Sequence, residues 1–168
     1  NDTLGDELVH SAVWNKLSYS LGQYYYRTDG IRENNDQQKN LYNAYVQGMI
    51  SPRTSWMSEV RFKKDSFGDL TVLFDPTRFS QTQRQEEEQK SARIGLRHDL
   101  QTHSTLLGTA VIGATDSSAE GIEGTGYSID IANTTDSVMA ELQHIYSGEH
   151  FNLQSGAGYL YSDETDTV

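Results

Sequence analysis

The sequence predicts an all-β fold built from antiparallel strands, and three observations lead to this prediction. Apolar and polar residues alternate with period two through most of the chain, which is typical of strands with one apolar face. Clusters of turn residues separate the alternating segments. The helical pattern of apolar residues is weak throughout. We expect seven principal strands in a single domain of residues 1–168, with residues 1–13 as a lead-in segment left open between strand and coil.

Three strands are expected before the first long acidic segment. In residues 14–26, Leu17, Tyr19 and Leu21 alternate with small or polar residues, and in residues 41–50 the even positions carry the apolar side chains. Ser51-Pro52-Arg53-Thr54 has the composition of a turn, because proline presets its own φ angle. Alternation resumes in residues 56–63, so these two strands form a hairpin.

Four further strands are expected in the rest of the chain, as two pairs around short turns. Residues 92–99 and 106–114 flank a turn at 101–105, and residues 138–146 and 151–161 flank a turn at 147–150. An extra ribbon at residues 69–74 and an extension of the sixth strand back to Tyr127 are additional options for strand structure.

The connections alternate in length, and this alternation indicates the architecture. Short turns at 51–54, 101–105 and 147–150 alternate with long polar connections at 27–39, 64–89 and 115–136. Short turns on one rim and long loops on the other are typical of an antiparallel, up-and-down transmembrane β-barrel, and strands of about ten residues suit a bilayer crossing. We expect such a barrel, or a segment of one, with about seven or eight strands. An odd count favours a piece of a larger barrel, whereas residues 1–13 or 69–74 as an eighth strand would allow a complete one.

Two sets of side chains agree with this barrel. Aromatic residues gather near the strand ends, as in the girdles of membrane barrels, and charged strand residues occupy the face opposite the apolar one, where they would line a lumen. The girdle residues are Trp14, Trp56 and Phe151 at the short-turn rim and Tyr24 to Tyr26, Tyr42, Phe62, Tyr159 and Tyr161 at the long-loop rim. The lumen-facing charges are Lys16, Glu59, Arg61, Lys63, Arg93, Arg97, Asp99 and Glu141.

Composition excludes several classes of protein. The chain has 24 acidic and 13 basic side chains and a formal net charge of -11, which argues against a nucleic-acid partner. It has no cysteine, so it has no disulfide and no thiolate metal site. No stretch of 18 apolar residues could form a transmembrane helix. Its 10 Tyr, 5 Phe and 2 Trp are too many aromatic residues for a disordered acidic tail.

No catalytic, metal-binding or cofactor-binding residue is predicted. The five histidines lack metal-ligand spacing, and Gly156-Ala157-Gly158 lies in a strand pattern with no helix after it to bind a phosphate. Acidic runs such as Glu86-Glu87-Glu88 are better explained as solvated loop residues than as a Ca²⁺ site. We therefore expect no enzymatic activity and no cofactor.

Several segments resemble the barrel region of large Gram-negative outer-membrane proteins, in which tetratricopeptide repeats precede a porin-like or TonB-receptor-like barrel. The segments are WNKLSYSLGQY at 14–24, RTDGIRENND at 27–36, Gly68-Asp69-Leu70, Phe74-Asp75-Pro76, Arg84-Gln85-Glu86-Glu87 and Glu141-Leu142-Gln143-His144-Ile145-Tyr146. The chain departs from that pattern because it has no 34-residue helical repeat and no terminal aromatic strand. The resemblance implies a barrel in the bacterial outer membrane and assigns no ligand residue.

The leading functional hypothesis is non-enzymatic passage or binding of a small solute at the Gram-negative cell surface, with outer-membrane lipid around the barrel. The lumen charges would line the path, and the loops at 64–89 and 115–136 would gate or recognise the solute. Two alternatives stay open: an anchor or export scaffold for an upstream periplasmic repeat domain, and a soluble secreted β-sandwich that binds a partner through its long loops. Further barrel strands are expected as partners of the sheet edges.

Overall fold

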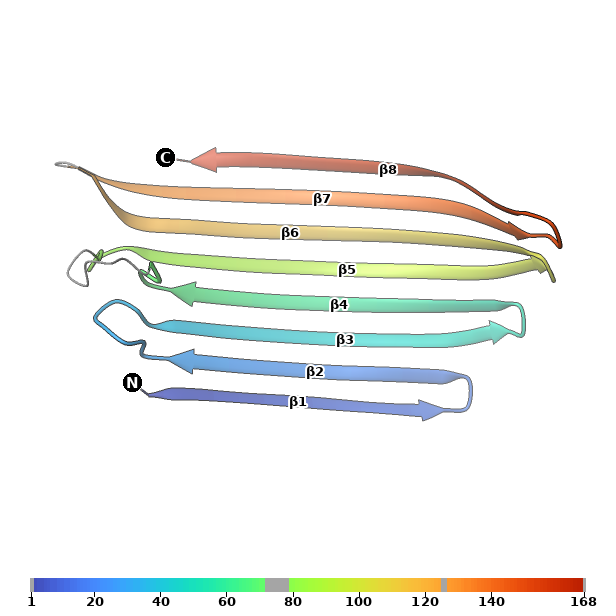
Figure 1. Cartoon of the computed structure of the whole chain (residues 1–168), viewed down its shortest axis with the longest axis horizontal. Coiled ribbons are helices and arrows are strands. Elements are labelled where there is room, and N and C mark those ends of the chain that lie inside the picture. Colours follow the sequence, from blue (N-terminus) through green and yellow to red (C-terminus); the bar gives the residue numbers. More distant parts are fainter. Residues whose placement is uncertain (1, 72–78, 125–126, 168) are drawn as a thin grey trace.

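The computed structural model describes residues 2–71, 79–124 and 127–167, and within these ranges the chain forms one antiparallel sheet of eight strands in sequence order (Figure 1). Each strand pairs with the next along the chain, so the topology is up-and-down, as the sequence predicted. The described ranges contain no helix. The strands are β1 (Thr3–Trp14), β2 (Leu17–Thr28), β3 (Gln37–Ser51), β4 (Thr54–Phe67), β5 (Arg84–Gln101), β6 (Ser104–Gly124), β7 (Tyr127–Ser147) and β8 (Asn152–Thr167).

The lead-in segment supplies the eighth strand. β1 pairs with β2 from Thr3↔Thr28 to Trp14↔Leu17, so the sheet has eight strands, the upper of the two predicted counts. Trp14 is the last residue of β1 and not the first residue of β2, as the sequence pattern had suggested. Asn15 can make the tight reversal between them because it adopts a positive φ of 54°, a conformation that Asn tolerates better than most residues.

The predicted long connection at 115–136 was wrong. β6 and β7 continue their ladder through this segment, with Thr115 opposite Thr135 and Asp116 opposite Thr134. The Thr134 hydroxyl donates a hydrogen bond of 3.0 Å to the Asp116 carboxylate. The polar composition indicated a loop, but threonine is β-branched and favours a strand whose faces are both wet. The extension back to Tyr127 is therefore confirmed.

The two rims of the sheet differ as predicted at two of the three long connections. One rim carries short turns, which include residues 52–53 and 102–103, and the other carries the long connections at 29–36 and 68–83. Residues 69–71 of the ribbon suggested at 69–74 lie outside any strand, and residues 72–74 fall outside the described residues.

The short turns are progressively displaced across the sheet. One row of paired residues runs through Trp14, Leu17, Gly48, Trp56, Leu96, Gly108, Leu142 and Ala157. Measured from that row, β1 ends on the row itself, β3 ends three positions beyond Gly48 at Ser51, and β5 ends five positions beyond Leu96 at Gln101. β7 also ends five positions beyond its own member of the row. Figure 1 shows this displacement as turns that move outward from β1–β2 to β7–β8.

The sheet is a single open layer. Within the part of the chain that the structure describes, the outer edges of β1 and β8 pair with no strand, and no hydrophobic side chain is buried. The described side chains that are buried are the carboxylates Asp65 and Asp69. Among these residues, no helix has the length and apolar character needed to cross a membrane. The apolar side chains therefore have no protein layer over them.

Candidate functional site

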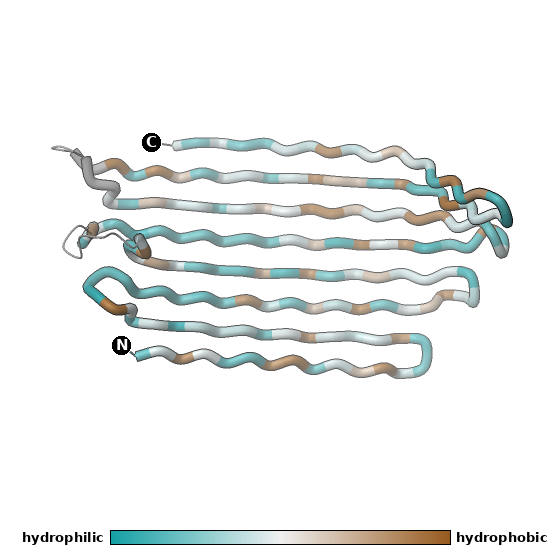
Figure 2. Tube along the Cα trace, in the orientation of Figure 1, coloured by the Kyte–Doolittle hydropathy of each residue, from teal (hydrophilic) through white to brown (hydrophobic). Residues whose placement is uncertain are grey.

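The strand register divides the side chains between two faces of the sheet. Residues paired across antiparallel strands point to the same side, and the side alternates along each strand. We call the side that carries Leu17, Trp56 and Leu96 the apolar face, and the side that carries Glu59 and Arg93 the charged face. In Figure 2, short hydrophobic bands are separated by hydrophilic or neutral stretches along the strands.

The apolar face carries branched aliphatic residues over its central strands, and these residues are exposed. Their exposed fractions lie between 43% and 57%, which is far above the value of a core residue. The central set is Val60, Ile94, Ile112, Val138 and Leu142. Large contiguous exposed apolar patches on protein surfaces mark contacts with membranes or with other molecules.

Most of the predicted aromatic girdle lies on this same face. Trp14 and Trp56 share the row nearest the first short turn, while Tyr42 and Phe62 face each other further towards the long-loop rim, with ring centroids 6.2 Å apart. Tyr159 and Tyr161 also lie on the apolar face, in β8.

The remaining aromatic candidates are placed differently. Phe151 lies in the β7–β8 turn against Tyr146, with ring centroids 5.6 Å apart. Of the triplet at 24–26, Tyr25 is on the apolar face, whereas Tyr24 and Tyr26 are on the charged face. The girdle predicted at 24–26 therefore divides between the two faces.

The charged candidates share the opposite face. The register places Glu59, Arg61, Lys63, Arg93, Arg97, Asp99 and Glu141 on the charged face, whereas Lys16 lies in the β1–β2 turn. A spacing of two along each strand was sufficient to group these seven residues.

Three of these residues form a cluster. Glu59 of β4 lies directly opposite Arg93 of β5, and one carboxylate oxygen binds Arg93 while the other lies 2.9 Å from Nη2 of Arg61. The Glu59 side chain is only 11% exposed, whereas Arg61 and Arg93 are 63% and 44% exposed. The carboxylate is therefore largely covered, and the two guanidinium groups on either side of it extend into solvent. We call these three residues the Arg–Glu–Arg cluster.

The other cations of the charged face pair one to one. Lys63 Nζ lies 3.3 Å from Glu87, and Arg97 Nη2 lies 3.1 Å from Asp99. Glu141 lies on a separate strand, where it accepts a hydrogen bond from Gln143. The predicted set is thus one cluster and two separate pairs, with Glu141 apart from them.

Sequence reasoning missed a further pair on this face. Lys39 Nζ lies 3.1 Å from the buried carboxylate of Asp65, which also accepts a hydrogen bond from Gln37. These residues, like Glu87, were assigned to long connections, so their alternation was not used. Continued period-two spacing past Leu41 and Lys63 was the signal that could have found them.

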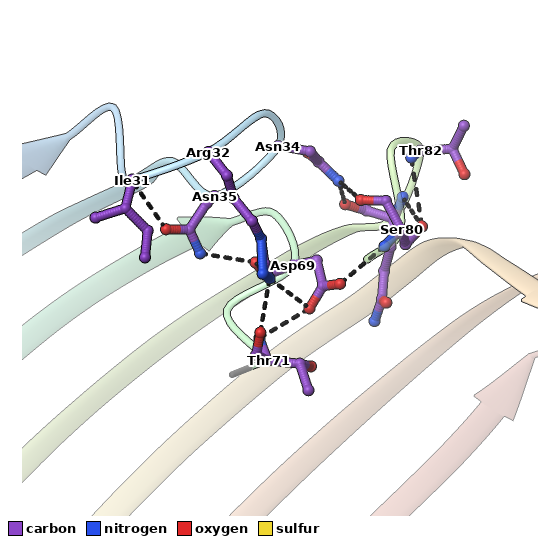
Figure 3. A network of polar contacts seen from close by, with 9 residues as sticks. Ile31, Arg32, Asn34, Asn35, Asp69, Thr71, Ser80 and Thr82 are labelled. Atoms are coloured by element: carbon purple, nitrogen blue, oxygen red, sulfur yellow. Dashed lines mark hydrogen bonds and ion pairs between the residues drawn. The ribbon is translucent and has the colours of Figure 1, made fainter. Parts of the chain in front are cut away.

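A second group of polar residues connects the long loops at the long-loop rim of the sheet (Figure 3). The Asp69 carboxylate is 6% exposed and accepts backbone hydrogen bonds of 2.8 Å from Thr71 and from Ser80. Arg32 lies 3.6 Å from this carboxylate and donates to the backbone carbonyls of Asp69 and Thr71. Asp69 thus connects three separate chain segments. We call this set of contacts the rim network.

Two asparagines complete the rim network. Asn34 donates from Nδ2 to the carbonyls of Ser80 and Gln83, and Asn35 donates to the carbonyl of Asp69. Gly68 is required at the contact because a Cβ there would lie 2.2 Å from the Asn34 carbonyl oxygen. The segments at 27–36 and 68–70, which the sequence placed in two separate long connections, therefore pack against each other.

Hydrogen bonding stabilises the charged form of two carboxylates at this rim. The backbone amide of Ser80 contributes most to lowering the pKa of Asp69, with help from Thr71 and Arg32, while burial opposes the shift. A hydrogen bond from Arg84, 2.6 Å away, lowers the pKa of Asp36. Both residues are therefore expected to be ionised in the folded protein at neutral pH.

The described residues contain no group of three or more His, Asp or Glu side chains arranged to hold a metal ion. No protein-family model matches the sequence, and a search of curated proteins also finds no match. The resemblance to outer-membrane barrels therefore rests on the quoted segments, and function has to be argued from the two faces of the sheet.

Proposed function

We propose that this sheet is a sector of an outer-membrane β-barrel wall, with the apolar face against lipid and the charged face lining a lumen through which a small solute passes or in which it binds. The observation that carries the proposal is the exposed aliphatic band on one face of a single-layered sheet. Burying that area against hydrocarbon would be favourable by about 25 cal/mol per Å².

In the middle of the sheet, at the level of Ser58 and Val60, the distribution of charge supports the same orientation. In the band from Trp56 to Val60 of β4, Ser58 lies on the apolar face, and Glu59 lies on the charged face. Charged side chains facing acyl chains at mid-depth are destabilising, whereas charged side chains facing a wet lumen are tolerated. The arrangement thus suits lipid on one side and water on the other.

The open edges of β1 and β8 complete the proposal. Edge strands present unpaired backbone groups, which cannot be satisfied inside a bilayer unless they pair with further strands. We therefore propose additional strands as partners of both edges, so that the eight strands form part of a closed wall.

The two tryptophans provide a direct test, since Trp14 and Trp56 are the only tryptophans in the chain and both lie on the apolar face. The full chain, inserted into vesicles made with brominated lipids, should lose much of its fluorescence. Bromine near the headgroup should quench more strongly than bromine near the chain ends, because both residues lie towards the short-turn rim. Acrylamide in the aqueous phase should quench weakly.

A second readout addresses transport. Cells expressing the full-length gene should yield the protein in the outer-membrane fraction with a gel mobility that changes on boiling, and vesicles containing it should admit small solutes. Protein that stays soluble, shows no mobility change and is quenched only by acrylamide would favour a second protein layer over the apolar face. Insertion without solute entry or binding would remove the transport part alone.

A further inference from the structure

The Arg–Glu–Arg cluster carries an excess of positive charge. Lys63, Arg97 and Lys39 each pair with one carboxylate, but Glu59 alone serves both Arg61 and Arg93. One carboxylate against two guanidinium groups leaves one net positive charge. This local excess contrasts with the formal charge of -11 for the whole chain.

The two guanidinium groups are held in place and accessible together. Each carries five N–H donors, and Glu59 contacts both of them through Nη2. Because the carboxylate is bound at both oxygens, it fixes the separation of the two side chains while their outer parts remain exposed. A planar fork of donors suits bidentate contact with a carboxylate or phosphate.

The neighbours on the charged face leave room for a ligand. Arg61 lies opposite Asn43 on one side and Ser91 on the other, and Ser91 in turn lies opposite Gly113. Arg93 lies opposite Val111. None of these four neighbours is acidic, so none would repel an anion, and Ser91 and Asn43 can donate further hydrogen bonds.

We propose that Arg61 and Arg93, with Glu59 as the positioning residue, form a binding site on the charged face for the carboxylate or phosphate group of a small anionic solute. This inference rests on the proposed function, because it names the class of solute that the lumen would admit. The site lies level with Val60 and Ile94 of the apolar face, so a solute that passes along the lumen would meet it near the middle of the sheet.

The test measures binding without requiring transport. The full chain, folded in detergent micelles as judged by its circular dichroism, is titrated calorimetrically with inorganic phosphate and separately with citrate at low ionic strength, since exposed charges are screened by salt. We expect both anions to bind, with affinity reduced at least tenfold in R61Q and in R93Q. R93K keeps the charge without the fork and should retain intermediate affinity.

Arg53→Gln is the matched control, because Arg53 is an exposed arginine in the β3–β4 turn and its loss removes the same charge. Its affinity should stay within twofold of the original protein. Absence of binding to the unmodified chain, or equal losses in R53Q and R93Q, would overturn the site. Phosphate binding alone or citrate binding alone would identify the group recognised.

Failure of the proposed function gives a different result. Anion binding in micelles that is lost in R93Q, together with no solute entry into vesicles, would retain the site and reject passage. Solute entry with no preference for anions, unchanged in R61Q and R93Q, would retain the barrel and reject the site.

Discussion

The middle of the sheet and its long-loop rim are stabilised in different ways. At the level of Val60 and Ile94, the described side chains are all at least partly exposed, and the protein supplies only backbone ladders and cross-strand pairs. At the rim, the Asp69 carboxylate accepts hydrogen bonds from Thr71 and Ser80 and forms an ion pair with Arg32. The stability of the middle of the sheet therefore depends on the medium or molecule that contacts its two faces. The stability of the rim comes from contacts within the chain itself.

This difference separates two contributions to stability. Changes at the middle of the sheet should have effects that depend on lipid and on which face they alter. Changes at the rim should have similar effects in vesicles and in micelles, because the partners of Asp69 belong to the same chain.

The largest effect is expected from a charge on the apolar face. In lipid vesicles, Leu142→Arg should destabilise the folded protein by about 2–4 kcal/mol, because Leu142 lies within the exposed aliphatic band of β7. The measurement is urea unfolding followed by tryptophan fluorescence. The matched variant Gln143→Arg puts the same side chain one position along, on the charged face, where the nearby Glu141 would accept it. Equal losses in the two variants would contradict the assignment of the faces.

A smaller effect on stability is expected from loss of the Asp69 side chain in the rim network. Asp69→Ala removes the acceptor of two backbone hydrogen bonds and the ion-pair partner of Arg32, which should cost about 1–3 kcal/mol. Limited proteolysis should then cleave residues 29–36 and 68–71 faster. Gly68→Ala should act in the same way through its overlap with Asn34, which tests the packing without removing a charge. Unchanged cleavage in both variants would show that the loops do not depend on this contact.

Acid should weaken the rim network selectively. Because the pKa of Asp69 is lowered in the folded state, its contribution is complete above the unfolded value of about 3.9 and is lost as pH falls through the lower folded value. Cleavage of the loops should therefore rise on acidification below about pH 4, measured with an acid-active protease. The Asp69→Asn variant should be cleaved quickly at all pH values, with little further change from titration at this position.

The smallest effect on stability is expected from Glu59→Gln. The carboxylate is poorly exposed, but both arginine partners are well exposed, so solvent screens the interaction and the loss should be below about 1 kcal/mol. Urea unfolding in vesicles measures this value beside that of Leu142→Arg. A loss of unfolding free energy as large as that of Leu142→Arg would mean that water is excluded from the charged face.

Period-two spacing predicted the all-β topology and the grouping of charged residues, because side-chain direction in a strand depends only on the parity of the position. The pairing of Glu59 with Arg93 is consistent with the up-and-down topology, in which strands consecutive in the sequence lie side by side. The sequence pattern failed at 115–136, where threonine and aspartate gave the composition of a loop to residues that continue the β6–β7 ladder.

The rim network could not be predicted in this way. Its contacts join Arg32, Asn34 and Asn35 to residues more than thirty positions away, and most of the hydrogen bonds involve backbone atoms. Side-chain chemistry alone does not encode such partners. A glycine next to an aspartate in a long polar segment gives only an indication of close packing.

The displacement of the short turns has a consequence for how the strands would stand in a bilayer. Five positions of about 3.3 Å over six strand spacings of about 4.8 Å correspond to a lean of about 30° when the turns lie at one level. A leaning strand crosses a hydrocarbon layer of about 25 Å in about nine residues. Residues 115–124 of β6 and their partners in β7 would then project beyond the hydrocarbon layer. The wall would be taller at β6–β7 than at β1–β2. Antibodies against the projecting part of these two strands should therefore label intact cells.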